Sequence, residues 1–144
     1  MPRESKLMQL ITQQISVEKE QIKHLTKLRE RVGIAAARLF LLEMRFDSEK
    51  HAAILTEMLE ILRGLPPGIS LWEHELEQYV DETLVRREFE EHVKIESDIL
   101  AHLKEELKRT KDMGLKLLLQ NIEEDEKKHH GIIHALVRNL YKID

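Results

Sequence analysis

Residues 125–130 read Asp125-Glu126-Lys127-Lys128-His129-His130, and residues 47–51 read Asp47-Ser48-Glu49-Lys50-His51. The two stretches lie 78 positions apart, and two further glutamates, Glu18 and Glu96, are separated by the same interval. The interval also superposes several other residues: Asp47 on Asp125, Lys50 on Lys128, Ile54 on Ile132, His24 on His102 and Leu25 on Leu103. An internal repeat has to be settled before a fold is assigned, because it fixes how the elements recur. We therefore interpret the chain as a duplicated helix pair.

The composition favours long amphipathic helices over sheet. Of the 144 residues, 35% are charged and only 4% are aromatic, and the chain contains 5 glycines and 3 prolines. This balance is typical of helical proteins with solvated outer faces. The length predicts a single domain over residues 1–144 that is large enough to bury a core. We expect an all-α fold.

Charge and cysteine content exclude several classes of function. The formal charge of -4 comes from interleaved acids and bases, so the sequence offers no basic surface for nucleic acid. The absence of cysteine excludes thiolate metal sites, iron–sulfur clusters and disulfides. The longest apolar run, residues 34–42, is interrupted by Arg38 and is too short to span a bilayer. We expect a cytoplasmic protein without a nucleic-acid or membrane partner.

Apolar residues spaced by four and three predict four helices, at about 5–31, 33–63, 83–109 and 112–141. Pro66 and Pro67 end the second helix, because proline cannot continue the helical hydrogen bonds. A continuous helix from Ser70 would carry Glu96 roughly 37 Å along its axis, far from the level of His51. We therefore expect a crossover over residues 64–82. The predicted fold is a four-helix bundle with this long crossover between its second and third helices.

Five polar residues interrupt the apolar rows near the helix midpoints: Glu18, His51, Glu96, Glu126 and His129. A carboxylate in a core has to be neutralised, paired or bound to a cation. A carboxylate and an imidazole at i and i+3, such as Glu126 and His129, lie on one helix face and can converge on one ion. Oxygen and nitrogen ligands suit iron, manganese or zinc, at one or two ions per chain. The alternatives are a metal-free network of Glu and His hydrogen bonds and a vestigial site.

The ordered set Glu18, Ser48-x-x-His51, Glu96 and Glu126-x-x-His129 resembles the ferritin-like superfamily of di-iron carboxylate proteins. It is most similar to the rubrerythrin-type and small prokaryotic ferritin-like domains, and the resemblance extends from Leu7 to Leu140. It implies that Glu18 and Glu96 are terminal ligands, that Glu126 bridges two metals, and that His51 and His129 each bind one metal.

Ser48 departs from the family pattern, because a second bridging glutamate is expected at its position. Only three of the implied ligands are therefore anionic. Ser48 itself, Asp47 and His92 are the additional candidate ligands. His92 lies one turn before Glu96 on the same face, where it can bind the metal, orient a carboxylate or simply pack.

The leading functional hypothesis is a non-haem iron or manganese protein with ferroxidase or peroxide-type redox chemistry. The alternatives are a non-catalytic metal-binding or metal-sensing module and a structural helical dimer. We expect a homodimer formed through apolar residues of the crossover: Leu71, Trp72, Leu76, Tyr79 and Val80. His130 and His134 lie one turn apart, and for them we favour a solvated helix edge over a surface ion site.

Overall fold

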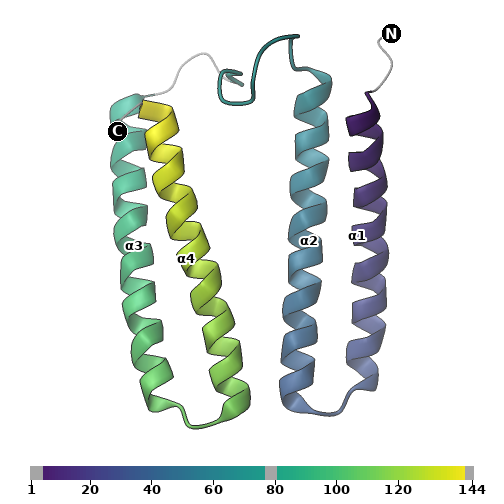
Figure 1. The fold of residues 1–144 in the computed structure, drawn as a ribbon, viewed down its shortest axis with the longest axis vertical. Coiled ribbons are helices and arrows are strands. Elements are labelled where there is room, and N and C mark those ends of the chain that lie inside the picture. Colours follow the sequence, from purple (N-terminus) through teal and green to yellow (C-terminus); the bar gives the residue numbers. More distant parts are fainter. Residues whose placement is uncertain (1–4, 77–80, 142–144) are drawn as a thin grey trace. The chain divides into compact units, whose positions relative to one another are not determined.

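The computed structural model describes residues 5–76 and 81–141, which form four α-helices and no strand. Their bounds are α1 (Lys6–Arg31), α2 (Ala35–Arg63), α3 (Glu82–Arg109) and α4 (Met113–Tyr141) (Figure 1). Each helix begins and ends within two residues of the predicted position. The prediction of an all-α fold with four helices is confirmed.

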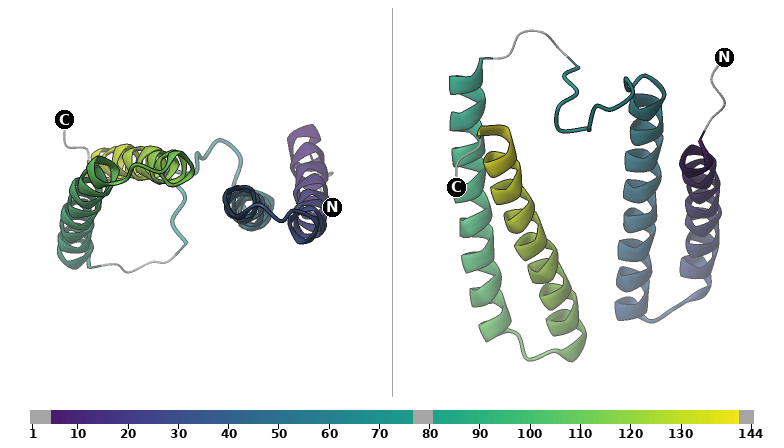
Figure 2. Two further views of the ribbon diagram at one scale, coloured as in Figure 1. Left: turned by 90° about the horizontal axis from the view of Figure 1, so that it is seen from below. Right: turned by 45° about the horizontal axis from the view of Figure 1, so that its top comes forward.

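The chain divides into two compact units, residues 1–69 and residues 70–144. In the first unit α1 packs against α2, and in the second α3 packs against α4 (Figure 2). Each unit is a helical hairpin whose two helices are joined by a short loop. A single domain over residues 1–144 remains a prediction.

Side-chain caps start three of the helices. Ser5 accepts a hydrogen bond from the backbone N–H of Met8 at 3.2 Å and so caps α1. Asp81 and Asp112 accept in the same way, at 3.2 Å and 2.9 Å, from the third residue after each. An acidic or hydroxyl side chain at this position satisfies a backbone donor that has no partner within the helix. The helix starts are therefore encoded locally.

Few side chains are fully buried within either hairpin. Among the residues whose burial is described, four apolar ones are buried in the first hairpin and two in the second: Ile11, Leu25, Ala52 and Leu59, then Leu103 and Ile133. The spacing of four and three places Met44 and Ile122 in apolar rows that we predict to face the bundle core. Both are nevertheless exposed, at 47% and 45%. A helix that has only one neighbour cannot cover the whole of a broad apolar stripe. Each hairpin by itself therefore presents apolar surface.

The helix bounds of the two hairpins are related by the sequence interval. Adding 78 to the bounds of α2 gives those of α4, and both helices contain 29 residues. Adding 78 to Arg31, the last residue of α1, gives Arg109, the last residue of α3. Leu25 and Leu103 are both buried, at 2% and 5% exposure. The second helices of the two hairpins thus share their length, the first helices share their last position but have 26 and 28 residues, and both hairpins have a core leucine at one register.

Ser70 organises the described part of the crossover into a turn. Its carbonyl accepts from the backbone N–H groups of Glu73 and His74, each at 3.1 Å, and its own N–H donates to Glu73 Oε1 at 3.2 Å. Hydrogen bonds from the Ser70 hydroxyl, and then from its backbone N–H, lower the pKa of Glu73. This reciprocal arrangement resembles a capping box. Residues 71–76 nevertheless form turns and a bend, not a regular helix.

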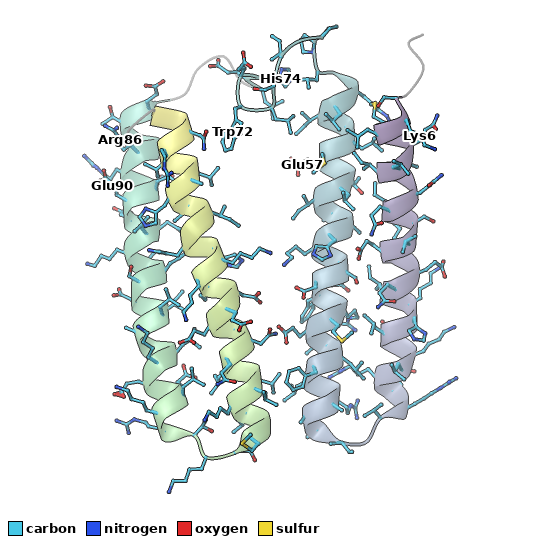
Figure 3. All side chains as sticks on the ribbon, in the orientation of Figure 1. Lys6, Glu57, Trp72, His74, Arg86 and Glu90 are labelled. Carbon is cyan, nitrogen blue, oxygen red and sulfur yellow. The ribbon has the colours of Figure 1, made fainter. Side chains whose placement is uncertain are left out.

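Three of the five apolar residues predicted for a dimer interface belong to the described part of the crossover. Trp72 projects from it beside His74 (Figure 3), and Leu71, Trp72 and Leu76 are exposed at 51%, 57% and 69%. Tyr79 and Val80 lie outside the described residues. Within the described parts of the chain, no helix combines the length and the apolar character that crossing a membrane requires.

Candidate metal centre

Glu96, Glu126 and His129 come together in the second hairpin. Each offers one ligand atom, and these atoms all lie within 4.8 Å of one another. Glu96 projects from α3, whereas Glu126 and His129 project from one face of α4, three residues apart. His129 Nδ1 lies 3.8 Å from Glu126 Oε1. The packing of α3 against α4 thus joins three of the five residues predicted to bind metal.

The three side chains differ in exposure. Glu96 is buried, at 4% for the residue, while the side chains of Glu126 and His129 are 20% and 47% exposed. Two carboxylates so close together repel each other, and partial burial reduces the screening of that repulsion by water. A cation between them would remove the repulsion.

Glu96 has one satisfied and one unsatisfied carboxylate oxygen. His92 Nε2 lies 3.0 Å from Oε1, at hydrogen-bonding distance. Oε2 is buried without a hydrogen-bond partner. A buried acceptor of this kind costs free energy unless a donor or a cation reaches it. An unsatisfied oxygen on a carboxylate that groups with Glu126 and His129 therefore fits a metal ion.

An open pocket of about 390 Å³ adjoins these residues. Its polar lining consists of His92, Glu96, Glu126 and His129, and its apolar lining consists of Ile99, Ile132, Ile133 and Leu136. The pocket is large enough for water and for small molecules, and its wall is largely apolar. In the second hairpin by itself, the α3–α4 group is thus accessible from one side.

The first hairpin brings together the corresponding pair. Glu18 Oε1 on α1 lies 3.5 Å from His51 Nδ1 on α2. Gln14 Nε2 donates to the same Glu18 oxygen at 3.1 Å, from the position that corresponds to His92 in the repeat. Ser48 is buried at 7% exposure. This hairpin therefore holds one carboxylate and one imidazole, with a hydroxyl at the position of the second carboxylate.

Asp47, an additional candidate ligand, has a partner on its own helix. Its Oδ1 lies 3.3 Å from Lys50 Nζ, and both side chains are more than 40% exposed. An exposed pair of this type contributes little to stability. The structure thus places the Asp47 carboxylate in an ion pair at the surface of α2.

Sequence reasoning missed the position of His130. Its side chain is only 30% exposed, and its buried Nδ1 lies 3.9 Å from Glu96 Oε2. Two features of the sequence indicate this position. His130 follows Glu126 by four residues, so it shares the same helix face, and its counterpart in the repeat is the small apolar residue Ala52.

Comparison of the chain with protein-family models, with curated proteins and with solved structures finds no match. The fold and the site together define an all-helical protein with a candidate Glu–Glu–His metal centre. The likeness to ferritin-like proteins rests on the order and spacing of the motif residues.

Proposed function

We propose that the protein binds a metal ion through Glu96, Glu126 and His129, in the manner of a ferritin-like di-iron carboxylate protein. The observation that carries this proposal is the proximity of the three ligand atoms, within 4.8 Å, beside a buried Glu96 oxygen without a partner. The two carboxylates would balance the charge of one divalent ion. Donors of this type suit iron, manganese or zinc.

Iron is the metal we propose first, with ferroxidase or peroxide-type chemistry. Bound iron would supply the one-electron redox chemistry. The chain would bind the ion, orient Glu96 through His92, and limit water through the apolar lining of the pocket.

We also propose that the two hairpins derive from a duplication and assemble into a ferritin-like four-helix bundle. The matching bounds of α2 and α4 and the buried Leu25 and Leu103 support the duplication. The exposed inward-row residues, such as Ile122, support the bundle, because a second layer of helices would cover them. Glu18 and His51 would then contribute to the same polar layer.

Ser48 favours a second candidate function, a non-catalytic metal-binding or metal-sensing module. It places a neutral hydroxyl at a buried position where the ferritin-like pattern has a negatively charged glutamate. A site with fewer carboxylates stabilises a second divalent ion less and would hold a single ion. A mononuclear site that binds zinc or manganese tightly would serve such a module.

A homodimer formed through the crossover remains part of the proposal. Leu71, Trp72 and Leu76 are exposed close together in the sequence and would be the apolar contacts. Sedimentation of the wild type and of Trp72→Ser would test it. A wild-type protein that stays monomeric at all concentrations would remove the dimer.

The rate of ferrous oxidation tests the redox function. We expect the anaerobically loaded protein to oxidise iron faster than buffer does when oxygen or peroxide is added. Glu126→Gln should reduce the rate towards that of buffer, while His102→Ala should leave it unchanged, because His102 is exposed and pairs with Glu106. Tight zinc binding without accelerated oxidation would favour the non-catalytic module instead.

A further inference from the structure

Two histidines of α4 face each other outside the Glu96, Glu126 and His129 group. His130 Nε2 lies 3.0 Å from His134 Nε2, and the rings meet edge to face, with centroids 4.5 Å apart and planes inclined by 79°. The two residues are one helical turn apart, so their side chains share one face of α4. The pair thus places two imidazole nitrogens close enough together to bind one ion.

The separation of these nitrogens matches that of two ligands on one ion. Zinc binds imidazole nitrogen at about 2.0–2.1 Å, so two nitrogens at angles of about 90–109° lie about 2.8–3.4 Å apart. The observed 3.0 Å falls within this range. A direct hydrogen bond between the rings gives the same separation. A bound ion would displace the shared proton, which would move to His134 Nδ1 or to solvent.

Glu96 favours the tautomer of His130 that a metal requires. His130 Nδ1 is buried without a hydrogen-bond partner, 3.9 Å from the equally buried Glu96 Oε2. A carboxylate facing Nδ1 favours the proton on that nitrogen and leaves a free lone pair on Nε2. Metal-binding histidines are commonly held in this way by a carboxylate behind the ring.

The surroundings of the pair leave room for further ligands. The His130 side chain is 30% exposed and His134 is exposed, so water can fill the remaining coordination positions. We propose that His130 and His134 form a separate binding site for a divalent ion of the zinc type, with Glu96 as the residue that positions His130. The ligand nitrogens belong to neither His129 nor Glu126, and Glu96 is the residue that this site shares with the centre proposed above.

A zinc titration of the full chain, followed by imidazole ¹⁵N NMR, tests this site. Before zinc is added, we expect the proton of neutral His130 on Nδ1. Zinc should shift the Nε2 signals of His130 and His134 together. His129→Ala should leave these shifts in place even if it abolishes binding at the α3–α4 centre, so the two proposals can fail separately.

A second test compares the number of zinc ions bound per chain by the wild type and by two histidine variants. We expect His134→Ala to bind about one fewer zinc ion per chain than the wild type, because a single imidazole holds zinc weakly. His102→Ala, which removes an exposed histidine paired with Glu106 at 3.3 Å, should bind as many ions as the wild type. Unchanged stoichiometry in His134→Ala, or Nε2 signals that do not respond to zinc, would show that the pair is only a hydrogen bond.

Discussion

Glu18 on α1 and His51 on α2 lie 3.5 Å apart, between Oε1 and Nδ1. The residues at the same register in the second hairpin, Glu96 and His129, belong to the Glu–Glu–His group. The two hairpins therefore differ at one decisive position, where α2 carries buried Ser48 and α4 carries Glu126. The first hairpin supplies one carboxylate and one imidazole, whereas the second supplies two carboxylates and one imidazole.

The replacement Ser48→Glu should convert the first hairpin into a stronger metal site. Without metal, a carboxylate at this buried position should destabilise the protein, on the order of several kcal/mol, because it loses hydration without gaining a partner. Added zinc or ferrous ion should restore the melting temperature by binding the new carboxylate beside Glu18 and His51. Melting curves with and without metal measure both effects.

Ser48→Ala is the control for that experiment, because it removes the hydroxyl without adding charge. Its melting temperature should respond to metal as the wild type does. If metal raises the melting temperature of Ser48→Glu no more than that of Ser48→Ala, Glu18 and His51 do not form part of a metal site.

His92 should strengthen metal binding through its contact with Glu96. The contact is 3.0 Å long, and Glu96 is the most buried of the three proposed ligands. Removal of a residue that orients a ligand typically lowers metal affinity by about 10–100-fold. We expect His92→Ala to weaken zinc binding within this range in competition titrations.

His102→Ala is the matched control, because His102 also pairs with a glutamate four residues later on α3, but at the surface. Its zinc affinity should equal that of the wild type. Equal affinities in both variants would assign His92 a packing role only.

Ile122 should contribute to stability more than its exposure in the hairpin suggests. It belongs to the predicted inward row of α4 and is 45% exposed, whereas Leu117, which lies off that row, is 52% exposed. If a four-helix bundle forms, Ile122→Ala should cost about 2–5 kcal/mol, the usual range for a buried isoleucine. Leu117→Ala should stay within about 0.5 kcal/mol of the wild type. Urea unfolding of both variants measures the difference, and equal small costs would contradict the bundle.

The helices were predictable because their signals are local. Apolar spacing fixed their extent, Pro66 and Pro67 marked the end of α2, and Asp112 marked the start of α4. The association of Glu96 with Glu126 and His129 was predictable for a related reason. Residues three and four apart share a helix face, and a short loop brings the neighbouring helix alongside.

The partners of individual side chains were less predictable. Asp47 pairs with Lys50, the oppositely charged residue three positions later on its own helix, and not with the predicted metal ligands. His130 was expected at a solvated edge, yet its Nδ1 is buried beside Glu96. The rotation of α4 about its axis against α3 decides whether His130 is buried. This rotation depends on how side chains along the whole interface pack together, which no local sequence pattern specifies.

Retention of iron after anaerobic loading and desalting, measured by elemental analysis, tests the α3–α4 metal centre most directly. The wild type and His102→Ala should each retain about one iron ion or more per chain, because the Glu96, Glu126 and His129 group remains intact in both. The double variant Glu126→Gln, His129→Ala should retain about one ion fewer than either. Circular dichroism should confirm that this variant keeps its helices. Wild-type protein that retains no iron, or a double variant that retains as much as the wild type, would contradict a metal centre at these residues.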